Sequence, residues 1–341
     1  MKIIYFLYVL KKTDYKKLLI YIKFVSQLKG ISRMNVVKDM LLCFYRYDTS
    51  FLDYFYLDFY EKSHLEKATY TSTWYMYNFQ KRLNNTAFLT YFKDKKKFYQ
   101  KFKNFVNHSH FLPNKENKAD FIKWLDDNEV SAIMVKSSDG QVGKGISKFK
   151  VTREGQFYFF NEFNIHKFYD FLFKNNLDLI ENFISQHQVL QNISPQALST
   201  IRVITVVDVN GNVKIEGAIL RMSVDKIVDN FDAGGVSAFI DVFTGIIQGS
   251  VKYKDPRQKE YLEVHPVTLK KVTGLQLPFW EEVTQMILKA AKLVPEVRTV
   301  GWDVVITNSG PFLLEGNHNW DKTHWQKSYG KGLKKNLEIY V

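Results

Sequence analysis

The stretch from residue 301 to residue 317 limits the fold of this chain more than any other part of the sequence. It reads GWDVVITNSGPFLLEGN, so that two apolar runs flank a short polar turn. Apolar runs of this length around a turn predict a β-hairpin. If the turn centres on residues 308–310, Thr307 faces Pro311 and Asp303 lies across from Glu315. Antiparallel strands are therefore expected near the end of the chain.

Two carboxylates sit opposite each other in this hairpin. Such a pair destabilises a sheet unless a positive group lies between the side chains. Because side chains on one face of a strand recur at every second residue, Asn317 shares the face of Glu315. Two carboxylates and an amide oxygen suit Mg²⁺, so we predict a magnesium site formed by Asp303, Glu315 and Asn317. Solvent-facing polar positions on an edge hairpin are the alternative, which fits poorly with the apolar residues around them.

A second hairpin carries two arginines. Two apolar runs flank Asn210-Gly211, which is a strong signal for a tight two-residue turn. Pairing across this turn brings Arg202 opposite Ile219, and Arg221 then lies on the same sheet face as Arg202. Arginines that share a face repel each other unless an anion joins them. They could grip a transferred phosphoryl group or an acyl phosphate, and structural pairing with a carboxylate explains either arginine alone equally well.

An apolar strand that ends at Lys136 opens into a glycine-rich loop. Residues 135–146 read VKSSDGQVGKGI. Three glycines let backbone N–H groups converge on an anion, and the lysines add positive charge. The loop therefore predicts a site for a triphosphate, and a plain glycine-rich hairpin is the alternative. The spacing of its glycines and lysines excludes both a P-loop and a GxGxxG motif. The candidate ligands are Lys136, Ser138, Gly140, Gly143, Lys144 and Gly145.

The order of patterns along the chain predicts an α+β fold built on antiparallel sheets. Helical periodicity covers residues 16–29, 35–46, 52–67, 93–106, 119–128, 165–174 and 279–293, with a linker at 108–117. Strands are expected at 131–136, 146–152, 156–160, 177–184, 200–207, 213–222, 236–241, 246–251, 301–307 and 312–316. We predict three parts: a mainly helical domain at 1–112, a small subdomain with the glycine-rich loop at 113–185, and a larger subdomain with the magnesium site at 186–341.

The positive charge belongs to the first third of the chain. Residues 1–120 hold 22 Lys and Arg against 10 Asp and Glu, a net charge of +12 out of +13 for the whole chain. Basic residues mixed with aromatic ones could bind nucleic acid, which we do not favour. Attraction to an anionic membrane or an anionic sugar polymer is a stronger alternative. A bias of composition, with aromatics in the core and lysines in solvent, explains the same pattern.

The cysteine content and the hydropathy limit the compartment. A single cysteine, Cys43, cannot form an internal disulfide, and no Cys/His array predicts zinc, so we expect a reducing, cytoplasmic setting. The apolar stretch at residues 3–10 is short for a secretory signal and is followed at once by charged residues. We therefore expect a first buried helix or strand there. No apolar run reaches the length that a membrane span needs.

Taken in order, these pieces resemble the ATP-grasp fold, and specifically the sugar-transfer associated ATP-grasp proteins found with surface-polysaccharide genes. The similarity covers residues 130–317 and reaches back more weakly to Lys93-Asp94-Lys95. The matching residues, besides Lys136 and its loop, are Glu181-Asn182-Phe183-Ile184, Gln186-His187, Leu198 to Val203, Asp229-Asn230, Gly234-Gly235, Gly301-Trp302-Asp303 and Leu314-Glu315-Gly316-Asn317.

The resemblance implies two α+β subdomains that grip ATP, and a role for particular residues. Lys136 and Lys95 would contact the ATP phosphates, and residues 181–184 (Glu181, Asn182, Phe183, Ile184) would form the hinge strand that reads adenine. His187 lies where many ATP-grasp ligases have a ribose-binding glutamate, and it joins the nucleotide-binding candidates. Asp303, Glu315 and Asn317 would hold Mg²⁺. Arg202 would neutralise phosphate charge, with Arg221 and Asn230 as further catalytic candidates.

The chemistry that the resemblance implies is activation of a carboxylate by ATP to an acyl phosphate, which an amine then attacks. We expect a ligase that joins an amine, for example of an amino acid, to a carboxylate on a sugar or a capsule-type surface-polysaccharide precursor. Two other functions stay open: kinase-like phosphoryl transfer to a sugar, and a nucleotide-binding scaffold subunit of a polysaccharide machine. In the tail, we expect residues 318–325 to border the acceptor site and Gln326 to lie near the surface, and we do not favour zinc at His318 and His324.

Overall fold

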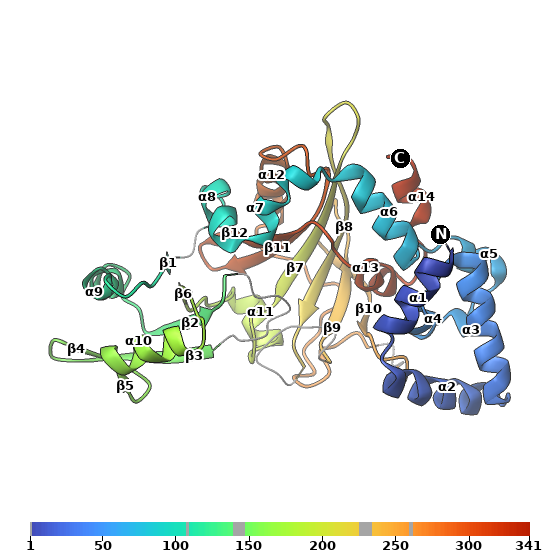
Figure 1. Ribbon diagram of the computed structural model, residues 1–341, viewed down its shortest axis with the longest axis horizontal. Coiled ribbons are helices and arrows are strands. Elements are labelled where there is room, and N and C mark those ends of the chain that lie inside the picture. Colours follow the sequence, from blue (N-terminus) through green and yellow to red (C-terminus); the bar gives the residue numbers. More distant parts are fainter. Residues whose placement is uncertain (1, 107–108, 139–146, 225–233, 259–261) are drawn as a thin grey trace.

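The computed structural model describes residues 2–106, 109–138, 147–224, 234–258 and 262–341. Its strands form two six-stranded sheets. In Figure 1 the larger sheet lies in the middle of the long axis and the smaller sheet at one end, and helices precede, cover and follow them. Every strand pair among these residues is antiparallel. This arrangement confirms the predicted α+β class.

The chain begins with a bundle of short helices. These are α1 (Lys2–Lys12), α2 (Tyr15–Lys29), α3 (Arg33–Tyr47), α4 (Phe51–Tyr56), the 3-10 helix η1 (Phe59–Glu61) and α5 (His64–Ala68). Buried aromatic side chains such as Tyr54, Phe55 and Phe59 fill its centre. The single helical stretch expected at residues 52–67 is broken into three. Asp58 adopts a left-handed backbone conformation (φ 53°) that a helix cannot continue, and Lys62 and Ser63 are extended before Ser63 caps α5.

The next helices leave the bundle and pack on the larger sheet. They are α6 (Thr73–Leu83), the 3-10 helix η2 (Thr86–Phe88), α7 (Thr90–Lys93) and α8 (Lys95–Lys101). Phe98 of α8 and Phe102, which follows its end, join the core of the larger sheet. The helix expected at 93–106 is shorter than predicted at both ends. Asp94 starts it by accepting hydrogen bonds from the N–H groups of Lys96 and Lys97, and it ends at Lys101, after which residues 102–105 form turns.

The smaller sheet has the strand order β1-β6-β2-β3-β4-β5. Its strands are β1 (His110–Phe111), β2 (Ala132–Lys136), β3 (Ser147–Glu154), β4 (Phe157–Phe160), β5 (Phe163–Asn164) and β6 (Leu179–Asn182), accompanied by α9 (Lys118–Asp127) and α10 (Ile165–Lys174). Stacked rings of Phe121, Phe160 and Phe168 form its core. The segment expected as a linker contains β1, which pairs with β6.

The larger sheet has the strand order β10-β9-β8-β7-β11-β12. Its strands are β7 (Thr200–Val207), β8 (Val213–Met222), β9 (Val236–Ile240), β10 (Ile247–Tyr253), β11 (Thr299–Thr307) and β12 (Gly310–Asn317), and its helices are α11 (Gln188–Ile193), α12 (Trp280–Ala291), α13 (Lys322–Tyr329) and α14 (Lys334–Glu338). Trp302 and Val304 of β11 pack in the same core as Val283 and Ile287 of α12. Because neighbouring strand residues point to opposite faces, Asp303 points to the other face.

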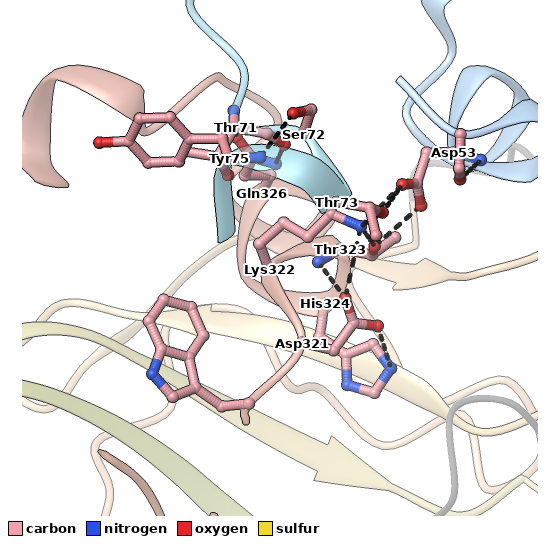
Figure 2. A network of polar contacts seen from close by, with 12 residues as sticks. Asp53, Thr71, Ser72, Thr73, Tyr75, Asp321, Lys322, Thr323, His324 and Gln326 are labelled. Carbon is pink, nitrogen blue, oxygen red and sulfur yellow. Dashed lines mark hydrogen bonds and ion pairs between the residues drawn. The ribbon is translucent and has the colours of Figure 1, made fainter. Parts of the chain in front are cut away.

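Buried polar contacts join the helical bundle to the larger sheet's helices (Figure 2). Lys322 of α13 donates from Nζ to Oδ2 of Asp53 at 2.7 Å, and the two side chains are 7% and 8% exposed. The hydroxyls of Thr73 and Thr323 donate to the same carboxylate at 2.7 and 3.2 Å. The bundle is therefore held against α13 by an ion pair that is shielded from water.

Candidate active site

The β11–β12 hairpin places Asp303 opposite Glu315, as predicted. The predicted pairing of Thr307 with Pro311 is wrong, because Thr307 pairs with Gly310 across a turn of only two residues. Gly310 has φ 121°, a conformation open to glycine, which permits this tight turn. A β-bulge between the pairs of Val304 and Asp303 then shifts the register by one residue. The bulge therefore restores the pairing of the two acids.

The β7–β8 hairpin shows the same compensation. Arg202 lies opposite Ile219, as predicted, and Arg221 pairs with Thr200. The two-residue turn expected at Asn210-Gly211 is wrong, because the last pair of the ladder is Val207 with Val213. Beyond it, the N–H of Asp208 donates to the carbonyl oxygen of Asn212, and the Asp208 carboxylate accepts hydrogen bonds from two N–H groups of the loop. A bulge farther along the ladder brings the pairing back into register. Both arginines therefore reach the face that carries Asp303.

Asp303 is the centre of this face. It is 3% exposed and forms a two-point ion pair with Arg202, whose Nη2 lies 2.9 Å from Oδ2 of Asp303 and whose Nε contacts Oδ1. Nη1 of Arg221 lies 3.2 and 3.1 Å from the same two oxygens. Burial alone would raise the pKa of Asp303, but the two guanidinium groups outweigh burial and hold that pKa well below its usual range. Asp303 is therefore an ionised carboxylate shared by two arginines.

Glu315 has the opposite electrostatic environment. Burial, followed by the charge of Asp303, raises the pKa of Glu315 above its ordinary value. The Nδ2 of Asn317 donates to Oε1 of Glu315 at 3.1 Å, which places the amide beside the carboxylate. A second ionised carboxylate at this place needs a nearby cation to offset the repulsion from Asp303.

The oxygen atoms of this face are of the kind that Mg²⁺ binds, and both oxygens of Asp303 already accept hydrogen bonds from Arg202 and Arg221. Carboxylate and amide oxygens are hard donors, and Mg²⁺ commonly takes one or two carboxylates together with water and phosphate oxygens. Among the residues that the structure describes, no group of three or more His, Cys, Asp or Glu side chains is placed to hold a metal ion. A cation held by Glu315, Asn317 and Asp303 would therefore complete its coordination with water or a nucleotide phosphate.

Lys136 lies on the smaller sheet and faces Glu181 of the neighbouring strand. Its Nζ is 2.6 Å from Oε2 of Glu181, and both side chains are largely buried. Tyr99 of α8 donates from its hydroxyl to Oε1 of the same carboxylate. Burial, then the charge of Glu181, raises the pKa of Tyr99, and Glu315 adds to the effect. Tyr99 thus lies within electrostatic reach of acids from both sheets.

Tyr99 is a site residue that sequence reasoning missed. It follows Lys95 by one helical turn, but no pattern in the sequence connects it with Glu181, which is 82 residues away. Lys95 itself donates from its backbone N–H to the carbonyl oxygen of Ser138 at 3.4 Å. The N–H and hydroxyl of Ser138 both donate to Asp178, which also pairs with Lys96 at 2.7 Å. The start of α8 therefore lies beside the start of the glycine-rich loop.

A cavity of about 660 Å³ opens between the two sheets. The expected hinge residues Asn182, Phe183 and Ile184 form one side, and Thr307 and Phe312 of the β11–β12 hairpin form the other. Its volume lies in the range of small-molecule sites. A larger cavity of about 1020 Å³ near residues 276–282 contains none of the predicted site residues. We therefore consider the smaller cavity the better candidate for nucleotide.

The remaining predicted residues are distributed as follows. His187 starts α11: its Nδ1 accepts a hydrogen bond from the N–H of Val189 at 3.2 Å, so the side chain acts as a helix cap. Its role toward a nucleotide stays a prediction. Gly140, Gly143, Lys144, Gly145 and Asn230 lie outside the described residues, and so does Asp229.

The expectation for Gln326 is wrong. Its side chain is fully buried, accepts a hydrogen bond from the N–H of Thr71 at 2.7 Å and donates to the carbonyl oxygen of Thr71 at 3.1 Å. It therefore satisfies backbone groups where the helical bundle meets α13. His324 lies nearer the arginine face, and burial lowers its pKa to about 3, so the imidazole is neutral at pH 7.

Comparison with known proteins shows the family. Residues 75–339, more than three quarters of the chain, match the family described as sugar-transfer associated ATP-grasp. This match also confirms the resemblance that the motifs suggested. No curated protein matches the sequence.

Similar solved structures include an ATP-grasp ligase, a biotin carboxylase and a D-alanine-D-alanine ligase. The ATP-grasp ligase PsnB in complex with a minimal precursor is 10% identical with a TM-score of 0.43, over 76% of this chain and 62% of its own. Biotin carboxylase from Campylobacter jejuni is 12% identical with a TM-score of 0.45, over 74% of this chain and 46% of its own. The D-alanine-D-alanine ligase from Coxiella burnetii is 11% identical with a TM-score of 0.41, over 73% of this chain and 57% of its own. The chain thus spans about half to three fifths of these proteins. By the family match, the chain belongs to the sugar-transfer associated ATP-grasp family.

Proposed function

We propose that the protein is an ATP-dependent carboxylate–amine ligase that acts through an acyl phosphate. The observation that carries this proposal is the shared face of Asp303, Glu315, Asn317, Arg202 and Arg221. It combines oxygen donors for Mg²⁺ with two arginines already oriented by one carboxylate. Transfer of a phosphoryl group depends mainly on positioning and on compensating negative charge, and these groups supply both.

Each part of the site has a task in this proposal. Glu181 to Ile184 and the 660 Å³ cavity would receive the adenine, while Lys136 and Lys95 would approach the phosphates. Asp303, Glu315 and Asn317 would hold Mg²⁺, which neutralises phosphate charge when bound. The salt bridges of Arg202 and Arg221 with Asp303 keep both guanidinium groups rigid, so that they can bind a phosphoryl oxygen with little loss of entropy.

The reaction proceeds in two balanced steps. A carboxylate oxygen of the substrate attacks the γ-phosphorus of ATP, and the bond from that phosphorus to the β,γ-bridging oxygen breaks to release ADP. The amine then attacks the carbonyl carbon of the acyl phosphate, loses a proton to solvent, and phosphate leaves with the former carboxylate oxygen. The net products are an amide, ADP and phosphate.

The family description supports a sugar-linked acceptor or donor. We propose a carboxylate or amine on a sugar or surface-polysaccharide precursor as the substrate, with an amino acid as one example of the partner. A cytoplasmic location would give such an enzyme access to ATP and to soluble precursors. The genes next to this one would narrow the choice of substrate.

Oxygen tracing tests the mechanism. The protein is incubated with Mg²⁺, ATP, a panel of uronic and amino acids carrying ¹⁸O in their carboxylates, and amines. The acyl phosphate route predicts one ¹⁸O atom in the released phosphate and a condensed amide in the mass spectrum. Phosphate without ¹⁸O beside an amide, or a phosphosugar as the only product, would reject the ligase mechanism.

A further inference from the structure

Exposed apolar side chains are concentrated at the beginning of the chain. Of the 25 large apolar side chains that are exposed among the described residues, 13 lie within the first 50 residues. This segment is about one seventh of the chain, so the exposure is not spread evenly over the surface. Concentrated exposed apolar surface on a soluble fold marks a place that binds another surface.

Helix α1 is apolar on both of its sides. Tyr5 and Val9 are 3% and 2% exposed and pack into the bundle. On the outer side, Ile3, Ile4 and Leu7 are 76%, 71% and 59% exposed, and their spacing places them together on one face. The expectation that this segment is buried is therefore only half right. A helix surrounded by water on one side normally carries polar residues there.

Positive charge predominates in the segment that carries this apolar face. The first 50 residues hold ten Lys and Arg and three Asp. Lys11 and Lys12 are exposed at the end of α1, and on α2 the exposed Leu19 (68%) and Ile20 (45%) alternate with exposed lysines such as Lys16 and Lys23. Aliphatic side chains next to lysines are typical of helices that lie in the interface of an anionic bilayer.

The combination of charges and aliphatic groups selects among partners. An anionic sugar polymer or a nucleic acid would pair with the lysines but would gain nothing from Ile3, Ile4 and Leu7. A second copy of the chain would bring two positively charged faces together, which is unfavourable. A bilayer with anionic headgroups satisfies both features, because its acyl boundary accepts the aliphatic groups while its headgroups pair with the lysines.

We infer that the outer face of α1 and α2 docks the protein on the surface of an anionic lipid bilayer. The docking face consists of Ile3, Ile4, Leu7, Tyr8, Leu19 and Ile20 with Lys11, Lys12, Lys16 and Lys23. No helix among the described residues is long and apolar enough to cross a membrane. The docking face lies along the surface and does not span the bilayer.

The position of the docking face leaves the nucleotide cavity accessible. In Figure 1, α1, α2 and α3 lie at one end of the long axis and the smaller sheet lies at the other. The ion pair between Lys322 and Asp53 holds the bundle against α13, so docking would give the whole molecule a defined orientation on the membrane (Figure 2). A membrane-bound precursor could then be presented to the site from one side.

Sedimentation with sucrose-loaded vesicles tests the inference. The full chain should sediment with phosphatidylcholine vesicles that contain phosphatidylglycerol, should stay in the supernatant with phosphatidylcholine alone, and should be released by salt. The Ile3→Ser/Ile4→Ser/Leu7→Ser variant should bind at least about tenfold more weakly, because its aliphatic contacts with the acyl boundary are lost. Lys11→Gln/Lys12→Gln/Lys16→Gln should weaken binding to the anionic vesicles in particular.

Phe243→Ser is the matched control, since Phe243 is 91% exposed but lies outside the docking face, and it should bind like the wild type. Near-ultraviolet circular dichroism and urea unfolding check that each variant is folded. The inference fails if the wild type does not sediment with anionic vesicles, or if the folded serine variant sediments as well as the wild type. It also fails if the wild type binds a soluble polyanion but no vesicle. A third contradicting result would be a dimer of the wild type in light scattering that becomes a monomer in the serine variant.

Discussion

Asp303 is the side chain whose charge most affects the stability of the site. Its buried carboxylate pairs with the guanidinium groups of both Arg202 and Arg221. Its replacement leaves these two largely buried cations without that carboxylate. We expect Asp303→Asn to lower the free energy of unfolding by about 3–5 kcal/mol, the usual cost of breaking a buried ion pair by removing one partner. Urea unfolding measures this difference. A loss below about 1 kcal/mol, the value of an exposed pair, would contradict the buried geometry.

Glu315 should behave differently from Asp303 toward pH. Its pKa in the folded protein is raised above the ordinary value of 4.5. Its contribution to stability is therefore complete below about that pH and is lost as the pH rises through the raised folded pKa, because the folded state then carries an unfavourable charge.

We expect Glu315→Gln to remove this part of the pH dependence in the absence of metal ions. Urea unfolding in EDTA, from acidic to neutral pH, compares the two proteins. The isosteric amide should lose less stability than Asp303→Asn at every pH above 4.5, and it should approach or exceed the wild type near neutral pH. An unchanged slope of stability against pH in the variant would show that Glu315 ionises normally.

At the scale of elements, strand β11 needs a glycine at position 301, because a side chain there would meet its neighbours. A Cβ atom there would lie 2.7 Å from Cβ of Trp320 and 3.0 Å from Cδ of Arg202. Gly301→Ala should therefore displace Arg202 from Asp303, lower stability by about 1–3 kcal/mol and reduce Mg²⁺-dependent ATP turnover.

Gly211→Ala provides a comparison for that variant. Gly211 has φ +82° at the tip of the β7–β8 hairpin, and an added Cβ would meet no atom within 4 Å. Its replacement should lower the free energy of unfolding by about 1 kcal/mol through backbone strain alone, and it should leave ATP turnover unchanged. Phosphate release and thermal unfolding of both variants check the pair of expectations. Equal turnover in the two variants would mean that the position of Arg202 is unimportant for the reaction.

The elements that sequence predicts well are those with a regular pattern. Strands β7 and β8 agree with the predicted ranges at both ends, because apolar residues fill them and turn residues bound them. The predicted turns were each wrong by one residue, and a bulge corrected each error before the site was reached. Strand patterns determine which residues pair, but bulges result from local backbone preferences that alternation does not encode.

Other elements lack such a pattern. Helix α13 was missed because its buried residues include Lys322, Gln326 and Lys327, which satisfy partners in the helical bundle and form no apolar stripe. The contact of Tyr99 with Glu181 was missed for a similar reason, since it joins elements that are far apart in sequence. Tertiary polar pairing is therefore the part of this molecule that the sequence alone does not reveal.

At the scale of the whole molecule, ion pairs from α13 connect the helical bundle with the rest, and the most deeply buried of those described joins Lys322 to Asp53. Burial would raise the pKa of Asp53, but the charge of Lys322 outweighs it, so the pKa lies below its ordinary value of 3.8. The pair therefore makes its full contribution to the free energy of unfolding at pH values above about 3.8. This contribution is lost as the pH falls through the lowered pKa of Asp53 in the folded protein.

We expect Asp53→Asn to lower the free energy of unfolding by about 3–5 kcal/mol at neutral pH, because the buried Lys322 ammonium then keeps only the more distant carboxylate of Asp321, 3.8 Å away. The double variant Asp53→Asn/Lys322→Met should recover much of this loss, since it removes both charges. Urea unfolding at pH 7 and at acidic pH gives the comparison, and the difference between wild type and Asp53→Asn should shrink on acidification. If the double variant lost as much free energy of unfolding as the two single variants together, a direct pairing of the two charges would be contradicted.

In the proposed function, the face of Asp303, Glu315 and Asn317 binds ATP through a magnesium ion. Isothermal titration of the protein with a non-hydrolysable ATP analogue, with and without Mg²⁺, measures this most directly. We predict binding that requires Mg²⁺ in the wild type and in Gly211→Ala, and that is at least about tenfold weaker in folded Glu315→Gln, as expected for the loss of a metal ligand. Equally tight binding by Glu315→Gln, or binding that is independent of Mg²⁺, would contradict the claim.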